Sequence, residues 1–447
     1  MPTLNEANAT RLARLGIHLP EVLLPKAGTD LAKWAVVACD QYTSDHAYWN
    51  QVDAIVGSAP STVRITLPEI YLEQPGVEGR IEKIHAAMAD YQARGILENQ
   101  GECIVYVKRT TEHSGTREGI VVAMDLERYD YSRDSKSLIR ATEGTIVDRI
   151  PPRLAVRRAA PLELPHIMIL IQDESRTVIE GLAAKVSGFD KVYDIQAMQN
   201  GGHLEGWKIS KPQDVEAILV SLEKLLDKTI ADQNSQTPLF WAMGDGNHSL
   251  ATAKARWEET KKELAEKGES TESIMAHPAR FALAEIVNIH SPGLLFEPIH
   301  RVVFTDDVPE LTETVLSEGT AEVAQIREED LQKLLVSPEG QNKAGYFDGR
   351  NWYVLSYKGA KLPTARVDEL FGRFQKVRPS ARIDFIHGWD DTKKLVSEGG
   401  GVFFTPVISR ERLFTWVQEN GPLPKKSFSM GHAEEKRYYM EVRRIVR

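Results

Sequence analysis

Cysteine is almost absent from this sequence. The chain has two cysteines, Cys39 and Cys103, among 447 residues. A disulfide framework needs several cysteines and a thiolate zinc site needs closely spaced ones, so the sequence supports neither. Long apolar runs are also missing, because residues 167–171 fall far short of the roughly 20 residues of a membrane helix. The polar opening segment does not look like a secretory signal, so we expect a cytoplasmic protein with no membrane partner.

An excess of basic residues is missing too. The chain has 55 Lys and Arg against 64 Asp and Glu, a formal net charge of −9. Nonspecific nucleic-acid binding needs a basic face that displaces counterions, so we expect no nucleic-acid partner. The 42% hydrophobic and 27% charged residues are typical of an ordinary globular protein. The sequence contains no internal repeat and does not indicate an oligomeric state.

The order of the expected elements indicates a mixed α/β fold of more than one structural unit. Two hairpins are predicted, at 103–108 with 119–125 and at 192–198 with 204–209. Continuous apolar runs at 164–171 and 238–243 are typical of buried strands. Helices are expected at 177–186, from the cap Ser210 through 226, at 247–261, and from Ser409 to Gly421. Length and pattern favour three α/β units, at 1–135, 136–275 and 276–447.

One turn has the parts of an anion site: Gly244-Asp-Gly-Asn-His-Ser249. It lies between a predicted strand and a predicted helix, where ligands of α/β proteins gather. Gly246 allows close approach, and Asn247, His248 and Ser249 lie at a helix start that offers unpaired N–H groups to a phosphate or carboxylate. Asp245 could hold Mg²⁺ or a ribose hydroxyl. The same residues are also a common turn and helix cap, so a purely structural role stays open.

Two other segments carry candidate residues. Asn288, His300 and Arg301 could form a polar wall that neutralises an anion, although histidines near strands are more often structural. Glu143 lies in a loop after a strand, where a carboxylate could act as a general base. Arg153 belongs to the densest run of arginines in the chain.

Five sequence blocks resemble one known family over nearly the whole chain. The blocks are Val37-Ala-Cys-Asp-Gln-Tyr-Thr43, Arg140-Ala-Thr-Glu-Gly-Thr145, Gly244-Asp-Gly-Asn-His-Ser249, Pro298-Ile-His-Arg301 and Leu423-Pro-Lys-Lys-Ser427. Together they resemble the bacterial and archaeal family catalogued as domain of unknown function 1015, a label that implies no activity by itself.

The turn also looks like a phosphate-binding box. Many members of that family read Asp-Gly-His-His-Arg there, which is similar to the box of the ParB-like group, a group that includes a free serine kinase. The resemblance implies that the turn grips nucleotide phosphates, that Glu143 is the base, and that a phosphoryl group moves to or from a serine-like metabolite. This chain departs from the box at Asn247 and Ser249, which removes a cation. Such a loss weakens phosphate binding by about 1.5–3 kcal/mol.

The leading expectation is therefore a phosphoryl-transfer enzyme for a phosphorylated or amino-acid metabolite of the serine or phosphoserine type. The cofactors expected are Mg²⁺ at Asp245 and a nucleotide, with no tightly bound transition metal. The expected catalytic residues are Glu143, Asp245 and His248, and the expected ligand-binding residues are Gly246, Asn247, Ser249, Asn288, His300, Arg301 and Arg153. A non-catalytic nucleotide- or metabolite-binding regulatory protein is the first alternative. A metal-dependent hydrolase using His248, His290 and His300 is the second.

Overall fold

The chain forms two compact units in a computed structural model that describes residues 2–164, 166–359 and 361–447, apart from the side chains of residues 397 and 398. Unit 1 comprises Met1–Leu295, Val417–Pro422 and Gly431–Arg447, and unit 2 comprises Phe296–Trp416 and Leu423–Met430. Both units mix helices with mixed or antiparallel sheets, which confirms the α/β class predicted from the sequence. Of the helices in the described residues, none combines the length and the apolar character that crossing a membrane requires.

The strands of unit 1 are β1 (Ile17–His18), β2 (Glu21–Pro25), β3 (Leu97–Glu102), β4 (Ile104–Thr111), β5 (Gly115–Asp125), β6 (Tyr129–Asp130), β7 (Ile139–Arg140), β8 (Leu162–Glu163), β9 (Met168–Ile171), β10 (Asp190–Gln196), β11 (His203–Ile209), β12 (Trp241–Asp245), β13 (Phe281–Asn288) and β21 (Arg443–Arg444). Its helices are α1 (Leu4–Ala7), α2 (Ala9–Leu15), α3 (Leu31–Trp34), α4 (His46–Val56), α5 (Val77–Ala93), α6 (Ile150–Arg158), α7 (Pro212–Gln233), α8 (Asn247–Glu266) and α9 (Thr271–Met275).

Unit 1 is built on a ten-stranded mixed sheet. Its strand order is β10-β11-β4-β5-β13-β9-β12-β7-β6, with β1 paired to β5. β9 runs parallel to β13 but antiparallel to β12. Because of this, β12 and β13 run in opposite directions, and their C-terminal ends lie at opposite ends of the strands. Polar residues that follow β12 and β13 therefore cannot lie in one site.

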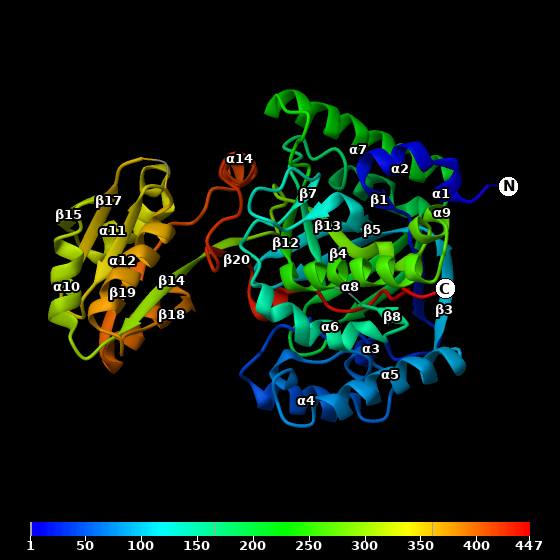
Figure 1. Cartoon of the computed structure of the whole chain (residues 1–447), viewed down its shortest axis with the longest axis horizontal. Helices are drawn as coiled ribbons and strands as arrows, with labels where there is room; N and C mark the ends of the chain where they lie inside the picture. The colour runs from blue at the N-terminus through cyan, green and yellow to red at the C-terminus, as the bar shows by residue number, and fades with distance from the viewer. Residues whose placement is uncertain (1, 165, 360) are drawn as a thin grey trace. The chain divides into compact units, whose positions relative to one another are not determined.

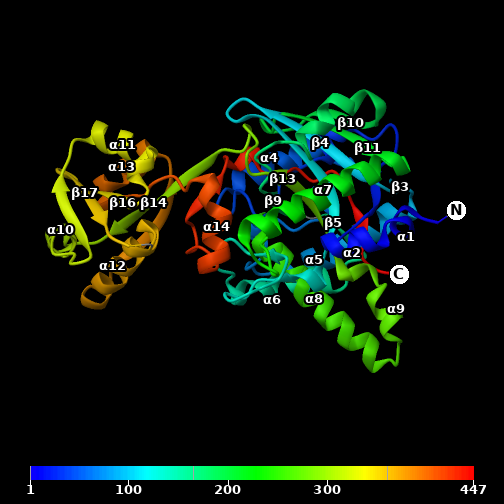
Figure 2. The same cartoon turned by 90° about the horizontal axis from the view of Figure 1, so that it is seen from above.

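Helices cover both faces of this sheet, because side chains of its strands alternate between two cores. Ile104 and Tyr106 of β4 point into a core that also holds apolar residues of α2, α7 and α8. Val105 and Val107 point into the opposite core, which holds residues of α3, α4 and α5. Figure 1 shows this layering, with α2 and α7 above the sheet of unit 1 and α4 and α5 below it. α8 lies beside α6, as Figure 2 also shows.

The C-terminal segment, residues 431–447, crosses the second core as an extended chain. The backbone N–H of Tyr439 donates to Val36 O at 2.9 Å, and Val442 N–H donates to Leu23 O at 3.0 Å. The indole of Trp34 donates to Met440 O at 3.1 Å. Residues 438–443 of this segment are therefore an internal part of unit 1.

Buried ion pairs fix this segment. The Arg437 guanidinium bonds to both Glu285 of β13 and Glu441, and all three side chains are buried. Burial alone would raise the pKa of Glu285, but the neighbouring Arg117 and Arg437 outweigh it and lower that pKa. Arg443 bonds to Glu163 of β8 at 2.8 Å in the same way. A buried charge is costly unless it is paired, so these contacts set where the segment can lie.

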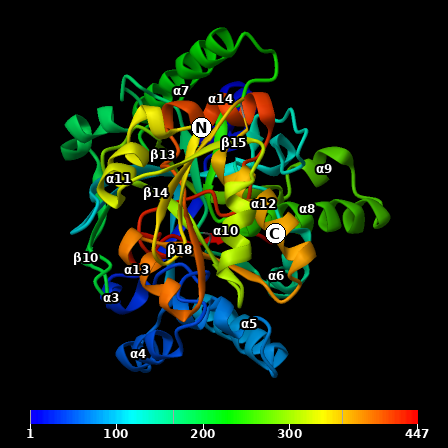
Figure 3. The same cartoon turned by 90° about the vertical axis from the view of Figure 1, so that its left-hand side faces the viewer.

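Unit 2 contains a separate seven-stranded sheet. Its strands are β14 (Phe296–Phe304), β15 (Ala321–Gln325), β16 (Lys343–Phe347), β17 (Trp352–Tyr357), β18 (Arg382–His387), β19 (Gly400–Phe404) and β20 (Phe428–Met430), in the order β15-β17-β16-β19-β14-β18 with β20 paired to β14. Its helices are α10 (Val308–Leu316), α11 (Glu328–Val336), α12 (Pro363–Val377) and α13 (Trp389–Lys394), and α14 (Arg410–Asn420) contains the boundary at Trp416. α10 and α12 cover one face, and α11 and α13 cover the other (Figure 3).

Most elements lie where the sequence predicts them, with two local differences. Helix α7 has Lys211 rather than Ser210 at its N-cap, a shift of the kind that is common at helix ends. The helix expected at 177–186 is a 3₁₀ helix at Glu180–Gly188. The carboxylate of Asp173 accepts the N–H groups of Thr177 and Val178 at 2.7 and 2.9 Å, which holds that stretch in a turn.

The structure also divides the chain differently from the three expected ranges. Residues 1–135 and 136–275 lie together in unit 1, because β4 and β5 join the same sheet as β9 and β12. Residues of the third range return to unit 1 at Val417–Pro422 and Gly431–Arg447. Hydrogen bonding between distant strands, which the order of elements along the chain does not show, sets these boundaries.

Replacing Arg437 with Met should lower the free energy of unfolding by about 3–5 kcal/mol, because it leaves two buried carboxylates without their partner. Urea denaturation of both proteins measures the change. Arg94→Met is the matched control, since Arg94 pairs with Asp90 on the exposed side of α5 at 2.8 Å and should cost under about 0.5 kcal/mol. Equal losses in the two variants would contradict the role given to Arg437.

Candidate functional site

The turn predicted from the sequence joins β12 to the long helix α8. β12 ends at Asp245, Gly246 is the N-cap, and α8 begins at Asn247. Gly246 has φ of +75°, and a Cβ atom there would lie 3.1 Å from Ile167 Cα and 3.3 Å from His166 Cδ2. The position therefore needs glycine for both its backbone conformation and its close packing.

The first turn of α8 suits an anion. The N-cap of this 20-residue helix is Gly246, which has no side chain to cap it, and the first turn of the helix holds no acidic residue. Asn247, His248 and Ser249 are half-buried. The start of a helix presents N–H groups without partners inside the helix and a partial positive charge, so it attracts phosphate and carboxylate groups.

The loop that carries Glu143 lies against this helix start. The Asn247 side chain donates to Glu143 O and accepts from Thr145 Oγ1, both at 3.3 Å. Ile146 N–H donates to His248 Nε2 at 3.4 Å. The structure therefore brings together two segments that sequence analysis named separately. Asn247 was predicted to bind ligand and His248 to act in catalysis. In the structure, the side chains of both residues form hydrogen bonds to the loop that carries Glu143.

Asp245 has a cationic partner from the C-terminal segment. Lys436 Nζ lies 3.1 Å from Asp245 Oδ2, and Asp245 Oδ1 accepts the Gly246 N–H at 3.0 Å. Lys436 is 8% exposed, so the pair is largely shielded from water. An ammonium group at this position does not fit the Mg²⁺ ion expected on Asp245, because the two cations would compete for one carboxylate. The cation at this turn is a lysine side chain.

A buried histidine–aspartate pair lies behind Gly246. His166 Nε2 is 3.1 Å from Asp40 Oδ2, and His166 Nδ1 is 2.8 Å from the Tyr439 hydroxyl. Burial alone would lower the pKa of His166, but the Asp40 carboxylate raises it well above the usual value. His166 is thus a second cation at the turn, close to Gly246.

Sequence analysis did not identify His166 or Lys436. The available signal for His166 was a polar residue within the apolar stretch 164–171, and Asp40 lies in one of the family-like blocks. Lys436 gave no local signal, since it lies in the C-terminal segment and reaches the turn only through the fold.

Asn288 does not belong to this site. It pairs with Ile171 at the end of β13, whereas Asp245 pairs with Met168 on the other side of β9. Met168 and Ile171 are three residues apart along β9, so their partners Asp245 and Asn288 are separated by about 10 Å along the strand direction. The Asn288 amide donates to Asp173 O at 2.8 Å and to Glu180, so it holds a loop at the opposite edge of the sheet. The sequence predicted Asn288 as a ligand-binding residue of the same site, and the antiparallel pairing of β12 with β9 places it elsewhere.

Arg153 and the His300–Arg301 pair also have structural partners. Arg153 Nε donates to Glu69 Oε1 at 2.7 Å. Arg301, which is fully buried, belongs to unit 2 and pairs there with Asp368 at 3.1 Å. His300 accepts from Thr405 N–H at 3.2 Å, and burial followed by the charge of Arg301 lowers its pKa to about 3. Each of these three side chains therefore has a partner within the fold.

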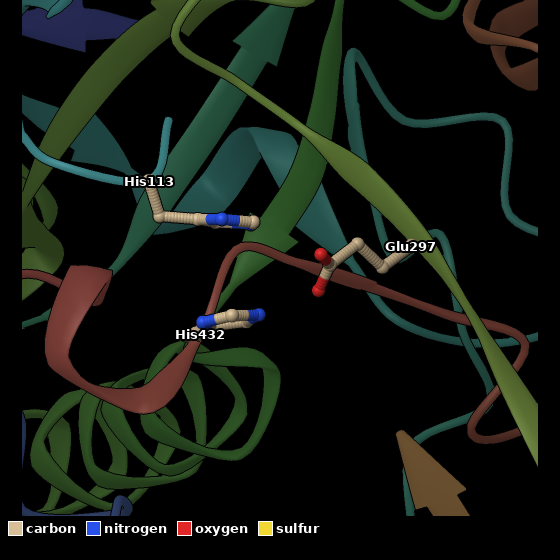
Figure 4. Close-up of side chains that lie close together, drawn as sticks. All are labelled: His113, Glu297 and His432. Carbon is tan, nitrogen blue, oxygen red and sulfur yellow. The ribbon is translucent and has the colours of Figure 1, made fainter. Parts of the chain in front are cut away.

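The histidines expected for a hydrolase do not form a metal site. Among the described residues, no group of three metal-ligating side chains includes His248, His290 or His300. Two other histidines of unit 1, His113 and His432, stack with ring centroids 4.0 Å apart and planes 13° apart (Figure 4). The stack ties the β4–β5 turn to the C-terminal segment. Glu297, also drawn there, belongs to unit 2, where it lies 3.4 Å from His387.

The fold and the turn define a mixed α/β protein. The start of α8, the loop that carries Glu143 and the buried cations Lys436 and His166 lie together at this turn. The chain belongs to the family described as "Protein of unknown function (DUF1015)", whose model matches residues 23–377. No curated protein matches the chain.

Among solved structures, the chain is similar to a conserved hypothetical protein from Pyrococcus furiosus, at 11% identity and a TM-score of 0.34, over 70% of this chain and 90% of that one. It is also similar to a free serine kinase in complex with AMP, at 11% identity and a TM-score of 0.38, over 75% of this chain and 95% of that one. At these values the function has to rest on the residues of the site.

Gly246→Ala should lower the free energy of unfolding by about 1–2 kcal/mol, the cost of placing an L residue in the left-handed region. Denaturant titration followed by tryptophan fluorescence measures the loss. The control is Gly79→Ala near the start of α5, where no neighbour lies within 4 Å of an added Cβ and the backbone is helical. An unchanged midpoint for Gly246→Ala would show that the turn is not constrained as described.

Proposed function

We propose that this protein transfers a phosphoryl group between a nucleotide and a small hydroxyl-bearing metabolite of the serine or phosphoserine type. One observation carries the proposal. The loop bearing Glu143 is hydrogen-bonded to the first turn of α8 through the Glu143 backbone oxygen and the Ile146 N–H, so Glu143 belongs to the segment that borders the start of a helix whose N-cap is a glycine. The resemblance of the turn to a phosphate-binding box points to the same ligand class.

Phosphate binding has identifiable donors in unit 1. The N–H groups of Asn247, His248 and Ser249 face the ligand from the helix start. Lys436, on Asp245, and His166, behind Gly246, add positive charge at the turn. Lys436 takes the place of the cation that the box loses through Asn247 and Ser249. A charge-assisted contact is roughly twice as strong as a neutral one, so one phosphate contact from Lys436 offsets the loss, whereas His166, whose two ring nitrogens bond to Asp40 and Tyr439, acts only through its charge.

The chemistry assigned to the site is an in-line transfer. Glu143 accepts the proton of the metabolite hydroxyl, and the hydroxyl oxygen forms a bond to the terminal phosphorus of the nucleotide. At the same time the bond from that phosphorus to the leaving nucleotide oxygen breaks. Negative charge that develops on the transferred group is stabilised by the helix start and Lys436. Asn247 and His248 position the loop that presents Glu143. Any magnesium ion enters as part of the nucleotide substrate.

A second candidate function is a regulatory protein that binds the same ligand without chemistry. The pairing of Asp245 with Lys436 favours it, because the carboxylate expected to hold Mg²⁺ already has a partner. The two functions share the binding site and differ only in turnover. They are separated by whether ligand is recovered unchanged after long incubation.

Lys436→Met should raise the dissociation constant for ADP by about 10- to 100-fold, the equivalent of one lost charge-assisted contact. Isothermal titration calorimetry measures the change. Lys262→Met, at an exposed position on α8 whose side chain is 79% exposed, is the control and should leave binding unchanged. Equal affinity in all three proteins would remove the turn as the nucleotide site.

Glu143→Gln should abolish ADP formation from ATP and serine while ADP still binds with an affinity within about threefold of wild type, since the amide keeps the shape but cannot accept the proton. A coupled ADP assay and calorimetry report the two properties. Glu266→Gln, at the exposed end of α8, should retain full turnover. Wild type that binds ADP but never turns over would favour the regulatory function, and undiminished turnover in Glu143→Gln would exclude Glu143 as the base.

A further inference from the structure

A small polar cavity lies inside unit 1, within the buried ion network. Its volume is about 10 Å³, and the charged groups that line it are Arg109, Arg117, Arg437, Glu285 and Glu441. A cavity of roughly 10–15 Å³ holds one particle of the size of a water molecule. The cavity is therefore large enough for a single small guest.

Three donors at this cavity lack hydrogen bonds. Within the described part of the chain, the Nε–H groups of Arg109, Arg117 and Arg437 are buried and make no hydrogen bond, and the ion-pair contact of Arg117 Nε with Glu285 Oε1 is 3.6 Å long. The three residues are only 2%, 8% and 6% exposed. A buried donor without an acceptor costs about 1–3 kcal/mol. Three such donors around one space indicate that something fills it and accepts from them.

The charges around the cavity do not balance. Three guanidinium groups face two carboxylates, Glu285 and Glu441, which leaves one positive charge in excess. Arg109 carries that excess, because its guanidinium donates to the carbonyl oxygens of Gly201, Glu434 and Lys436. Burial, followed by repulsion from Arg117, lowers the pKa of Arg109 to about 10.

Two other groups near the cavity do not fill it. Glu435 acts on Arg109 electrostatically from outside the cavity lining, and its carboxylate accepts from Thr111 Oγ1 at 2.6 Å and Ser114 N–H at 3.0 Å rather than from the three Nε–H groups. Tyr193 at the cavity donates its hydroxyl to Glu441 at 2.6 Å, and burial raises its pKa, so it stays neutral. The guest best suited to the space therefore carries a negative charge.

We propose that this cavity binds one small monovalent anion of the size of chloride, held by the Nε–H groups of Arg109, Arg117 and Arg437. A water molecule has two lone pairs for three donors and would not offset the buried positive charge. The site is separate from the turn at α8 and does not depend on the function proposed there. Because Arg109 bonds to Lys436 O, the anion also helps to hold the C-terminal segment in place.

The first arm of the test compares melting temperatures in sodium chloride and sodium gluconate at one sodium concentration. Gluconate is too large for the cavity, so chloride should raise the melting temperature by about 2–4 °C when the site is mostly filled. Arg94→Gln, a surface control, should keep this rise, and Arg109→Gln should lose it. A melting temperature in chloride equal to or below that in gluconate would overturn the proposal.

The second arm needs no variant and so does not depend on whether Arg109→Gln folds. Crystals of the wild-type protein are soaked in sodium bromide and diffraction is measured at the bromine absorption edge. An anomalous peak between the three guanidinium groups is the expected result. Density for a water molecule without an anomalous signal at that position would overturn the proposal.

Discussion

The ion pairs of Arg437 with Glu285 and Glu441 are the constraint on which the site depends. They fix the C-terminal segment inside unit 1, and the residues on either side of Arg437 in that segment reach the functional turn. Lys436 contacts Asp245, and Tyr439 contacts His166. Buried charges tolerate little displacement, because an ion that moves away from its partner is left buried without water or an opposite charge, which is strongly destabilising. The network thus sets the position of the cations at the start of α8.

The phosphate site that we propose depends on electrostatics at the turn, because the box is altered in this chain. The residues at 247 and 249 are uncharged, yet the turn has two cations from other parts of the fold. Each is held by a carboxylate, His166 by Asp40 and Lys436 by Asp245. The pairs are neutral without ligand, so the turn is stable when empty. The partial positive charge at the start of α8 provides the remaining attraction for an anion.

Local chemistry made much of this structure predictable. Asn200 and Gly202, both with positive φ, close the β10–β11 hairpin, and the glycine-containing turn before α8 lies where the sequence places it. Strand order was not predictable, because periodicity does not show which strands pair. The position of β9 between β13 and β12 separates Asn288 from Asp245. The contacts of His166 with Asp40 and of Lys436 with Asp245 join distant parts of the chain, so spacing could not reveal them.

The most direct test of the central claim is a crystal structure of the protein with a non-hydrolysable ATP analogue and magnesium. The account predicts phosphate oxygens within hydrogen-bonding distance of the backbone N–H groups of residues 247–249, with Lys436 Nζ and the Glu143 carboxylate facing the terminal phosphate. An analogue bound elsewhere in unit 1, or bound with its phosphates away from the start of α8, would contradict it.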